Sequence, residues 1–281
     1  MRKLLLSTSI LLLLANCSST KTSSADLLQG TWIAANKEPL RSPFGQIAGS
    51  NPNVKDQSQV FRYDGFSIIQ DRYDYFDGFY DRKRGRNQES QYFGHLTDFK
   101  VAGGSLYYYN PIKKGFFFKG KIESLTRDEL VLVDNENNPQ TYLKKKTRIH
   151  DTFDRIDISL SPCYGPCPVF DLTVSKDGSA VLKAERHLDK KDTYKTAIPL
   201  PLVDYLFSKF EQQPILKYKT RYAASHTDDQ TVTLKFYRNG KLVKTITDYG
   251  SYSPQELLWA IQTLKFLHLR NHIDWINTNP Q

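Results

Sequence analysis

The residues with the clearest chemical potential in this sequence are its three cysteines, Cys17, Cys163 and Cys167. The last two enclose the segment Cys-Tyr-Gly-Pro-Cys, which leaves three residues between the two sulfur positions. In an oxidising compartment such a pair is typical of a disulfide, and closing so small a loop contributes about 2 kcal/mol. Two alternatives stay open. A thiol–disulfide redox pair usually has only two intervening residues, and a nucleophilic cysteine needs an unpaired thiol.

Other side chains that could do chemistry lack the necessary spacing. His150, His187 and His226 do not stand at zinc-ligand spacing from the cysteines. The acidic residues of Asp71–Asp77 and of Asp134–Asn138 depart from the calcium-loop pattern and are more typical of turns. No nucleophile motif, zinc-protease motif or phosphate-binding glycine loop is present. We expect a protein that is not an enzyme, with no metal and no cofactor.

Composition narrows the class of protein. The 281 residues are 39% hydrophobic and 25% charged, which is typical of a folded body and argues against wholesale disorder and a multi-span membrane protein. The formal net charge is +9, and two of these charges belong to Arg2 and Lys3. The single dense basic run, residues 82–86, fits a solvated loop or a contact with anionic headgroups. We expect no nucleic-acid partner.

The N-terminus has the layout of a secretory leader. A short basic head precedes an apolar stretch, Leu4–Leu14, which is too short to span a bilayer. The sequence Leu-Ala-Asn-Cys that follows resembles the lipobox of bacterial lipoproteins, with Asn16 where Gly, Ala or Ser is usual. The resemblance implies a leader at residues 1–16, acylation of Cys17, and a tether at residues 17–25. It places the protein in the bacterial cell envelope, anchored to a membrane that we expect to be the outer membrane.

Residues 26–149 predict an all-β domain. Short aromatic and β-branched runs alternate with Gly, Asn, Asp and Pro turns, and no helix-length pattern appears. The expected strands are 29–33, 60–63, 66–69, 91–99, 106–109, 116–122, 130–133 and 141–143. The opening Gly30-Thr31-Trp32 and the stretch Ile122–Leu132 resemble lipocalin-like domains of bacterial lipoproteins. That resemblance implies an antiparallel β-barrel in which Trp32 closes the floor against Arg148.

Two aromatic triplets face each other within this domain. Strand side chains alternate between the two faces, so each triplet sends rings to both. Among these rings we consider four as the lining of a ligand mouth for a small apolar molecule. These four residues are Tyr107, Tyr109, Phe116 and Phe118.

Residues 150–281 predict an α+β domain in which an antiparallel sheet is covered by two helices. Asp177-Gly178 and Asn239-Gly240 are strong hairpin signals between β-branched runs. The segment 199–213 carries one apolar stripe at helical spacing. A second helix is expected to begin at Ser253–Glu256, which has the pattern of a capping box with proline in the first turn.

The C-terminal segment also resembles a bacterial domain of unknown function whose hallmark is a C-[FY]-G-x-C-P opening. This pattern begins at Cys163 and continues through Asp228 and the triplet Asp248-Tyr249-Gly250. The resemblance implies an extracytoplasmic α+β domain without an assigned activity. We interpret Asp228 and Asp248 as turn-capping residues.

These expectations favour a lipid-anchored envelope protein that binds a small ligand in its barrel. One alternative is a structural protein that binds another envelope component through residues 150–281. The other is a thiol–disulfide redox protein that uses Cys163 and Cys167.

Overall fold

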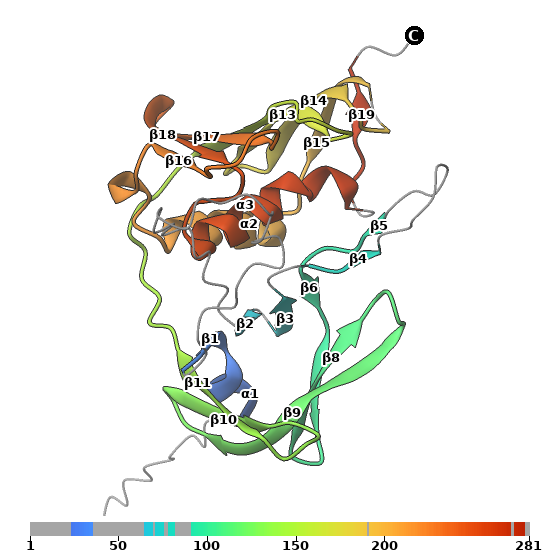
Figure 1. The fold of residues 1–281 in the computed structure, drawn as a ribbon, viewed down its shortest axis with the longest axis vertical. Helices are drawn as coiled ribbons and strands as arrows, with labels where there is room; N and C mark the ends of the chain where they lie inside the picture. Colours follow the sequence, from blue (N-terminus) through green and yellow to red (C-terminus); the bar gives the residue numbers. More distant parts are fainter. Residues whose placement is uncertain are drawn as a thin grey trace, which may run out of the picture.

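The computed structural model describes residues 24–35, 65–69, 71–75, 78–81, 91–189, 191–270 and 273–278. Two mainly antiparallel sheets dominate it, with two helices between them (Figure 1). Several expected features lie outside the described residues: the leader expected at 1–16, Cys17, the strand expected at 60–63 and the basic run at 82–86. Within the described ranges, no helix has the length and apolar character needed to cross a bilayer.

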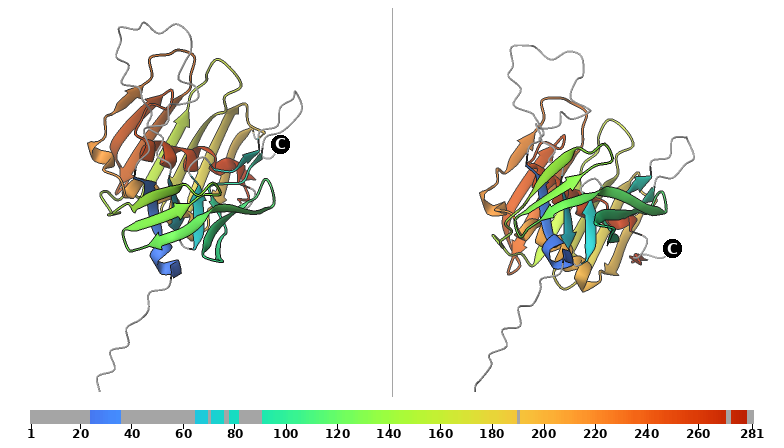
Figure 2. Two further views of the ribbon diagram at one scale, coloured as in Figure 1. Left: turned by 60° about the horizontal axis from the view of Figure 1, so that its bottom comes forward. Right: turned by 90° about the horizontal axis from the view of Figure 1, so that it is seen from below.

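The first sheet has nine strands in the order β6-β3-β2-β1-β11-β10-β9-β8-β7. Only Asp98 separates β6 from β7, so one stretch of chain pairs with β3 by its first part and with β8 by its second. The sheet is therefore a nearly closed barrel (Figures 1 and 2). Its strands are β1 (Gly30–Ala34), β2 (Gly65–Ile69), β3 (Arg72–Tyr75), β6 (Leu96–Thr97), β7 (Phe99–Ala102), β8 (Ser105–Asn110), β9 (Gly115–Leu125), β10 (Glu129–Val133) and β11 (Pro139–Lys144).

Alternation along these strands fills the inside of the barrel with large side chains. Phe66 stacks on Tyr73, with ring centroids 5.2 Å apart, and Tyr73 stacks on Tyr108 at 5.1 Å. Burial of apolar surface stabilises a fold by about 0.8 kcal/mol per methylene group. The buried aromatic rings therefore stabilise the barrel. The buried residues of this core are Leu28, Trp32, Phe66, Ile68, Tyr73, Leu106, Leu130, Leu132 and Tyr142.

Two smaller elements flank the barrel. Helix α1 (Ser24–Leu28) precedes β1 and contacts β9, and its Leu28 belongs to the barrel core. A separate pair, β4 (Tyr80–Asp81) and β5 (Gln91–Tyr92), comes between β3 and β6.

The second sheet has eight strands in the order β16-β18-β17-β12-β13-β14-β15-β19. All its neighbouring pairs are antiparallel except β16 with β18. The chain passes from the first sheet to the second between Lys144 and Arg155. The strands are β12 (Arg155–Leu160), β13 (Val169–Ser175), β14 (Ser179–Arg186), β15 (Asp192–Ala197), β16 (Arg221–Ala223), β17 (Thr231–Arg238), β18 (Lys241–Tyr249) and β19 (Ile276–Asn277).

Helices α2 (Leu200–Glu211) and α3 (Gln255–Lys265) cover the face of this sheet that is turned toward the barrel (Figure 1). On α2, the stripe that includes Val203, Phe207 and Phe210 is buried against the sheet, as the apolar spacing predicted. The short 3-10 helices η1 (Ile215–Lys217) and η2 (Leu267–Leu269) follow α2 and α3.

Both predicted hairpins of the second sheet form. β17 and β18 are joined by Asn239 and Gly240, whose φ angles are 52° and 70°. Two left-handed residues in succession give the turn whose twist matches antiparallel strands, and Asn-Gly accommodates it with the least strain. Gly178 joins β13 to β14 with φ 92°.

The capping box predicted before α3 does not form. Pro254 occupies the N-cap position, and no side chain caps the helix. The Ser253 hydroxyl instead donates a hydrogen bond of 2.6 Å to Oδ2 of Asp248. A nearby buried carboxylate is a stronger acceptor than a backbone group, so it takes the hydroxyl that the helix end would have used.

Other differences from the predicted strands have local causes. The strand expected at 91–99 is broken into β5, β6 and the start of β7. Gly94, with φ 90°, lies between β5 and β6. β3 was not predicted, because Asp71 and Asp74 gave its region the composition of a loop. The edge strands β15, β16 and β19 are polar and exposed, so they lack the alternation that marks a half-buried strand.

The outer wall of the barrel at β1, β2 and β3 packs against α2 and α3. Asp74 of β3 is fully buried there and accepts a hydrogen bond of 3.0 Å from the Tyr205 hydroxyl. It also pairs with the ammonium group of Lys209, whose side chain is 10% exposed. The same ammonium lies 3.8 Å from the centroid of the Trp259 ring. These contacts join the barrel to the two helices that cover the second sheet. We call the group Asp74, Tyr205, Lys209 and Trp259 the polar lock.

Candidate functional site

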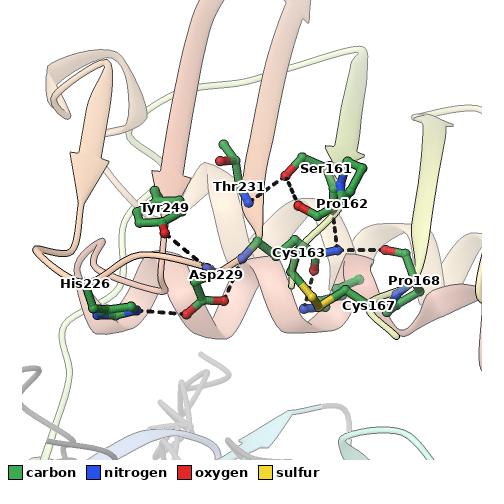
Figure 3. The surroundings of a disulfide bond; sticks show 11 residues. Ser161, Pro162, Cys163, Cys167, Pro168, His226, Asp229, Thr231 and Tyr249 are labelled. Carbon is green, nitrogen blue, oxygen red and sulfur yellow. Dashed lines mark hydrogen bonds and ion pairs between the residues drawn. A yellow bond between two sulfur atoms is a disulfide. The ribbon is translucent and has the colours of Figure 1, made fainter. Parts of the chain in front are cut away.

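A disulfide closes the tight loop between β12 and β13. It joins Cys163 to Cys167, with the two Cα atoms 5.8 Å apart (Figure 3). Inside the loop, the Gly165 N–H donates a hydrogen bond of 2.9 Å to the Cys163 carbonyl. The two sulfurs are bonded to each other, so neither is a thiolate nucleophile in this state.

A buried glutamine holds both ends of this loop. The side-chain amide of Gln230 donates hydrogen bonds to the carbonyls of Ser161 (2.8 Å) and Pro168 (2.7 Å). Its oxygen accepts a hydrogen bond of 3.0 Å from the Lys265 ammonium on α3. Burial lowers the pKa of Lys265, and Asp229 partly opposes that shift. Two hydrogen bonds from Gln230 therefore hold the loop in addition to the disulfide, and a third joins Gln230 to α3.

A second loop, between β16 and β17, lies beside the disulfide. Its His226 ring is 3.1 Å from Oδ2 of Asp229, and the Asp229 N–H donates to the Tyr249 hydroxyl at 3.1 Å (Figure 3). The Tyr164 N–H donates to the Asp228 carbonyl, which ties the two loops together. We call residues 161–168, 226–230 and Tyr249 the disulfide corner.

A glycine lets this second loop approach β18. Gly250 has φ 73°, and a Cβ atom there would lie 2.8 Å from the Cβ of Ala224 and 3.0 Å from Nε2 of His226. Neither distance leaves room for a side chain, so the sequence position next to Tyr249 requires glycine.

The two aspartates singled out by the motif make different contacts. The Tyr252 N–H donates to Oδ1 of Asp248 at 2.7 Å, in addition to the Ser253 hydroxyl bond on Oδ2. Burial raises the pKa of the Asp248 carboxyl, and these hydrogen bonds oppose the rise. Asp228 sits in a turn with φ 75°. The turn-capping interpretation fits Asp248, whereas the Asp228 carboxylate accepts a hydrogen bond of 3.3 Å from the Thr227 hydroxyl.

The disulfide corner presents one aromatic ring to solvent. Tyr164 at the tip of the loop is 89% exposed, while the Gln230 side chain beneath it is buried. An exposed tyrosine on a braced loop offers a broad apolar ring and a hydroxyl, at little cost in side-chain entropy on binding. The arrangement is suited to recognition of a partner.

Trp32 and Arg148, the partner expected for it at the barrel floor, each have printed contacts with other residues. Trp32 is fully buried and its indole N–H donates to the Leu28 carbonyl at 2.8 Å. The cation beside its ring is Lys144, with Nζ 4.6 Å from the ring centroid. The same ammonium donates to the Leu27 carbonyl, whereas Arg148 is exposed and its Nε donates to His150. Lys144 faces Trp32 because it pairs with that residue across β1 and β11.

The four aromatic residues expected to line a ligand mouth come from β8 and β9. Leu106 and Tyr108 point into the barrel core, so the alternate positions on β8 face outward. There Tyr107 contacts Phe118 and Tyr109 contacts Phe116 in edge-to-face pairs. These two pairs lie on the outer face of β8 and β9, not on the inside of the barrel.

A pocket between the barrel and α2 has a volume of about 250 Å³, below the usual range of about 300–1,000 Å³ for ligand sites. Its lining includes Thr31, Asp204, Tyr205 and Gln212. Among the described residues, no three His, Cys, Asp or Glu side chains gather in a way that could hold a metal ion.

Sequence reasoning missed Gln230, Lys265 and Asp74. Each is a common residue type, and its role depends on partners far along the chain. The motif around Cys163 located the disulfide corner, but no local signal marked the buried groups that support it.

Comparisons with known proteins place one part of the chain. No curated protein and no solved structure matches it. Residues 154–268, which contain the disulfide corner and both covering helices, match a family model described as a domain of unknown function (DUF6438). The C-terminal part of this chain is therefore a DUF6438 domain.

Proposed function

We propose that this protein is a non-enzymatic component of the bacterial cell envelope that binds another envelope component through the disulfide corner. In this proposal the acylated Cys17 holds it to a membrane, expected to be the outer membrane. The lipobox-like sequence before Cys17 and the oxidised pair downstream support this location, because structural disulfides persist outside the cytosol.

The observation that carries the proposal is the exposure of Tyr164 on a braced loop. A disulfide, the Gln230 amide and the Lys265 ammonium all support one loop whose tip is 89% exposed. Tyrosine is among the residues that contribute most binding energy at protein interfaces. A loop fixed before binding also loses less conformational entropy when a partner attaches.

The barrel is proposed to be a lipocalin-like unit that supports this domain. The Gly30-Thr31-Trp32 opening, the buried Trp32 at one end and the nearly closed meander support that assignment. We do not propose ligand carriage inside it, because Phe66, Tyr73 and their neighbours occupy the interior.

Site-specific photo-crosslinking in intact cells tests the docking surface. A photoreactive residue replaces Tyr164 in the full chain, and a second chain carries it at Lys183, an exposed position on β14. We expect a discrete adduct from position 164 that disappears when Cys163→Ser and Cys167→Ser are added. No adduct at 164, or the same adducts from 183, would overturn the proposal.

A further inference from the structure

The hairpin of β8 and β9 carries aromatic side chains on the outer face of the barrel. Its outer face carries the two aromatic pairs Tyr107–Phe118 and Tyr109–Phe116. Phe116 is 43% exposed, although a phenylalanine ring is normally buried. β9 is the longest strand of the sheet, and the hairpin extends beyond the neighbouring strands (Figures 1 and 2).

The tip of this hairpin is ordered. The side-chain oxygen of Asn110 accepts hydrogen bonds from the N–H groups of Ile112 (3.0 Å) and Lys113 (3.1 Å). Lys114 completes the turn with φ 52°. The partly exposed Ile112 and the exposed Lys113 and Lys114 are therefore held in a fixed arrangement at the apex.

The charge of the hairpin has one sign. From Phe99 to Lys121 the chain carries five lysines and no Asp or Glu. Lys100 lies over the outer aromatic face, with its ammonium 4.4 Å from the Phe116 centroid and 5.5 Å from that of Tyr107. Lys100 and the outer aromatic rings thus share one exposed surface, whereas Lys119 lies against the core ring of Phe66.

We propose that this hairpin is a peripheral membrane contact that lies on anionic phospholipid headgroups. Aromatic rings favour the boundary between headgroups and acyl chains, and lysines near an anionic surface are attracted to lipid phosphates. The separate lysine ammoniums suit a diffuse layer of phosphates better than a single acidic site on a protein. The contact acts independently of any lipid on Cys17.

Vesicle co-sedimentation tests this contact without the proposed anchor. A chain that begins at Ser18 keeps every described residue and both cores, and lacks the leader and Cys17. It is mixed with vesicles of phosphatidylethanolamine and phosphatidylglycerol, and with vesicles of phosphatidylcholine. We expect binding to the anionic vesicles alone, weakened by salt above about 0.15 M.

Two variants identify the surface that binds. Lys113→Glu with Lys114→Glu should weaken binding at least ~20-fold, because each lysine contributes about a fivefold gain near an anionic surface. Lys241→Glu with Leu242→Ser alters another hairpin tip with an exposed lysine and an apolar side chain 52% exposed, and should leave binding unchanged. Near-ultraviolet circular dichroism checks that both variants are folded.

Three outcomes would overturn the proposal: no binding to anionic vesicles, equal binding to phosphatidylcholine, or equal losses in the two variants. A dimer in sedimentation equilibrium that Phe116→Ser dissociates would assign the surface to a second copy of the chain instead. Because the test omits Cys17 and leaves Tyr164 in place, its result is separate from that of the proposed docking function.

Discussion

Lys144 shows how a single residue decides the closure of the barrel floor. The expected partner of Trp32 was Arg148, which follows the last strand, but cross-strand pairing brings Lys144 to the ring instead. Sequence alone could not separate the two, because the answer depends on the register of β1 against β11. Burial lowers the pKa of Lys144, which reflects its position against the indole and the end of α1.

Replacing Lys144 should therefore weaken the floor, whereas replacing Arg148 should not. Lys144→Ala removes a hydrogen bond to the Leu27 carbonyl and a cation–π contact, at an expected cost of about 1–2 kcal/mol. Arg148→Ala is the matched control and should change stability by less than about 0.5 kcal/mol. Urea unfolding measures both, and equal effects would refute the assignment.

The disulfide and the exposed Tyr164 in its loop should differ in their effects on stability. Cys163→Ser with Cys167→Ser should lower the free energy of unfolding by about 2 kcal/mol, since the loop it closes is short. Tyr164→Ala should cost almost nothing, because its ring is exposed. Thiol trapping separates structure from redox chemistry: a pair that is labelled in cells, or easily reduced, would favour the redox alternative.

At the scale of elements, periodic and turn signals predicted most of the second sheet. The Asn239-Gly240 hairpin and the apolar stripe of α2 act through local geometry, so sequence was sufficient. The start of α3 shows the limit. Its Ser253 hydroxyl goes to Asp248, which lies on β18 and was not part of any local helix signal.

The Ser253–Asp248 bond predicts an effect on stability that a helix cap would not show. Ser253→Ala leaves the buried Asp248 carboxylate with one donor fewer, at a cost of about 1–3 kcal/mol. The loss should shrink when Asp248→Ala is already present, because the two residues act through one bond. Additive losses in a double-mutant cycle would contradict this pairing.

At the scale of the whole molecule, the two sheets depend on each other through a buried polar lock. Asp74 and Lys209 are 135 positions apart, so no pattern along the sequence could have paired them. Burial lowers the pKa of Lys209, and the coulombic attraction of Asp74 opposes that shift. An ion pair this deeply buried is costly to break from one side only.

Asp74→Ala should therefore cost about 3 kcal/mol, because it leaves the Lys209 ammonium buried without its carboxylate. Lys209→Met should cost a similar amount. Asp74→Asn with Lys209→Met should cost less than the sum, since it removes both charges. Chemical unfolding monitored by Trp fluorescence reports all three, and strict additivity would argue against the lock.

His95 lies close to Asp74 and Lys209 and makes the stability of the polar lock depend on pH. Its ring is buried and close to Asp74, Lys209 and Arg270, and burial lowers its pKa below the usual 6.5. Between the two pKa values, His95 is protonated in the unfolded chain but neutral in the folded chain. The free energy of unfolding therefore falls as the pH decreases from about 6.5 toward the lowered pKa of the folded state. His95→Asn should remove this part of the loss between about pH 7 and pH 5. An identical pH profile in both proteins would show that His95 is not its source.

We propose that the protein lies outside the cytosol, tethered at Cys17 and oxidised at the disulfide corner. Intact-mass analysis of the protein purified from its native membrane tests these features together. We predict a chain that begins at Cys17, carries acyl groups on that residue, and has the mass of a joined Cys163–Cys167 pair. An unacylated N-terminus, or a mass that shows two free thiols, would contradict the account.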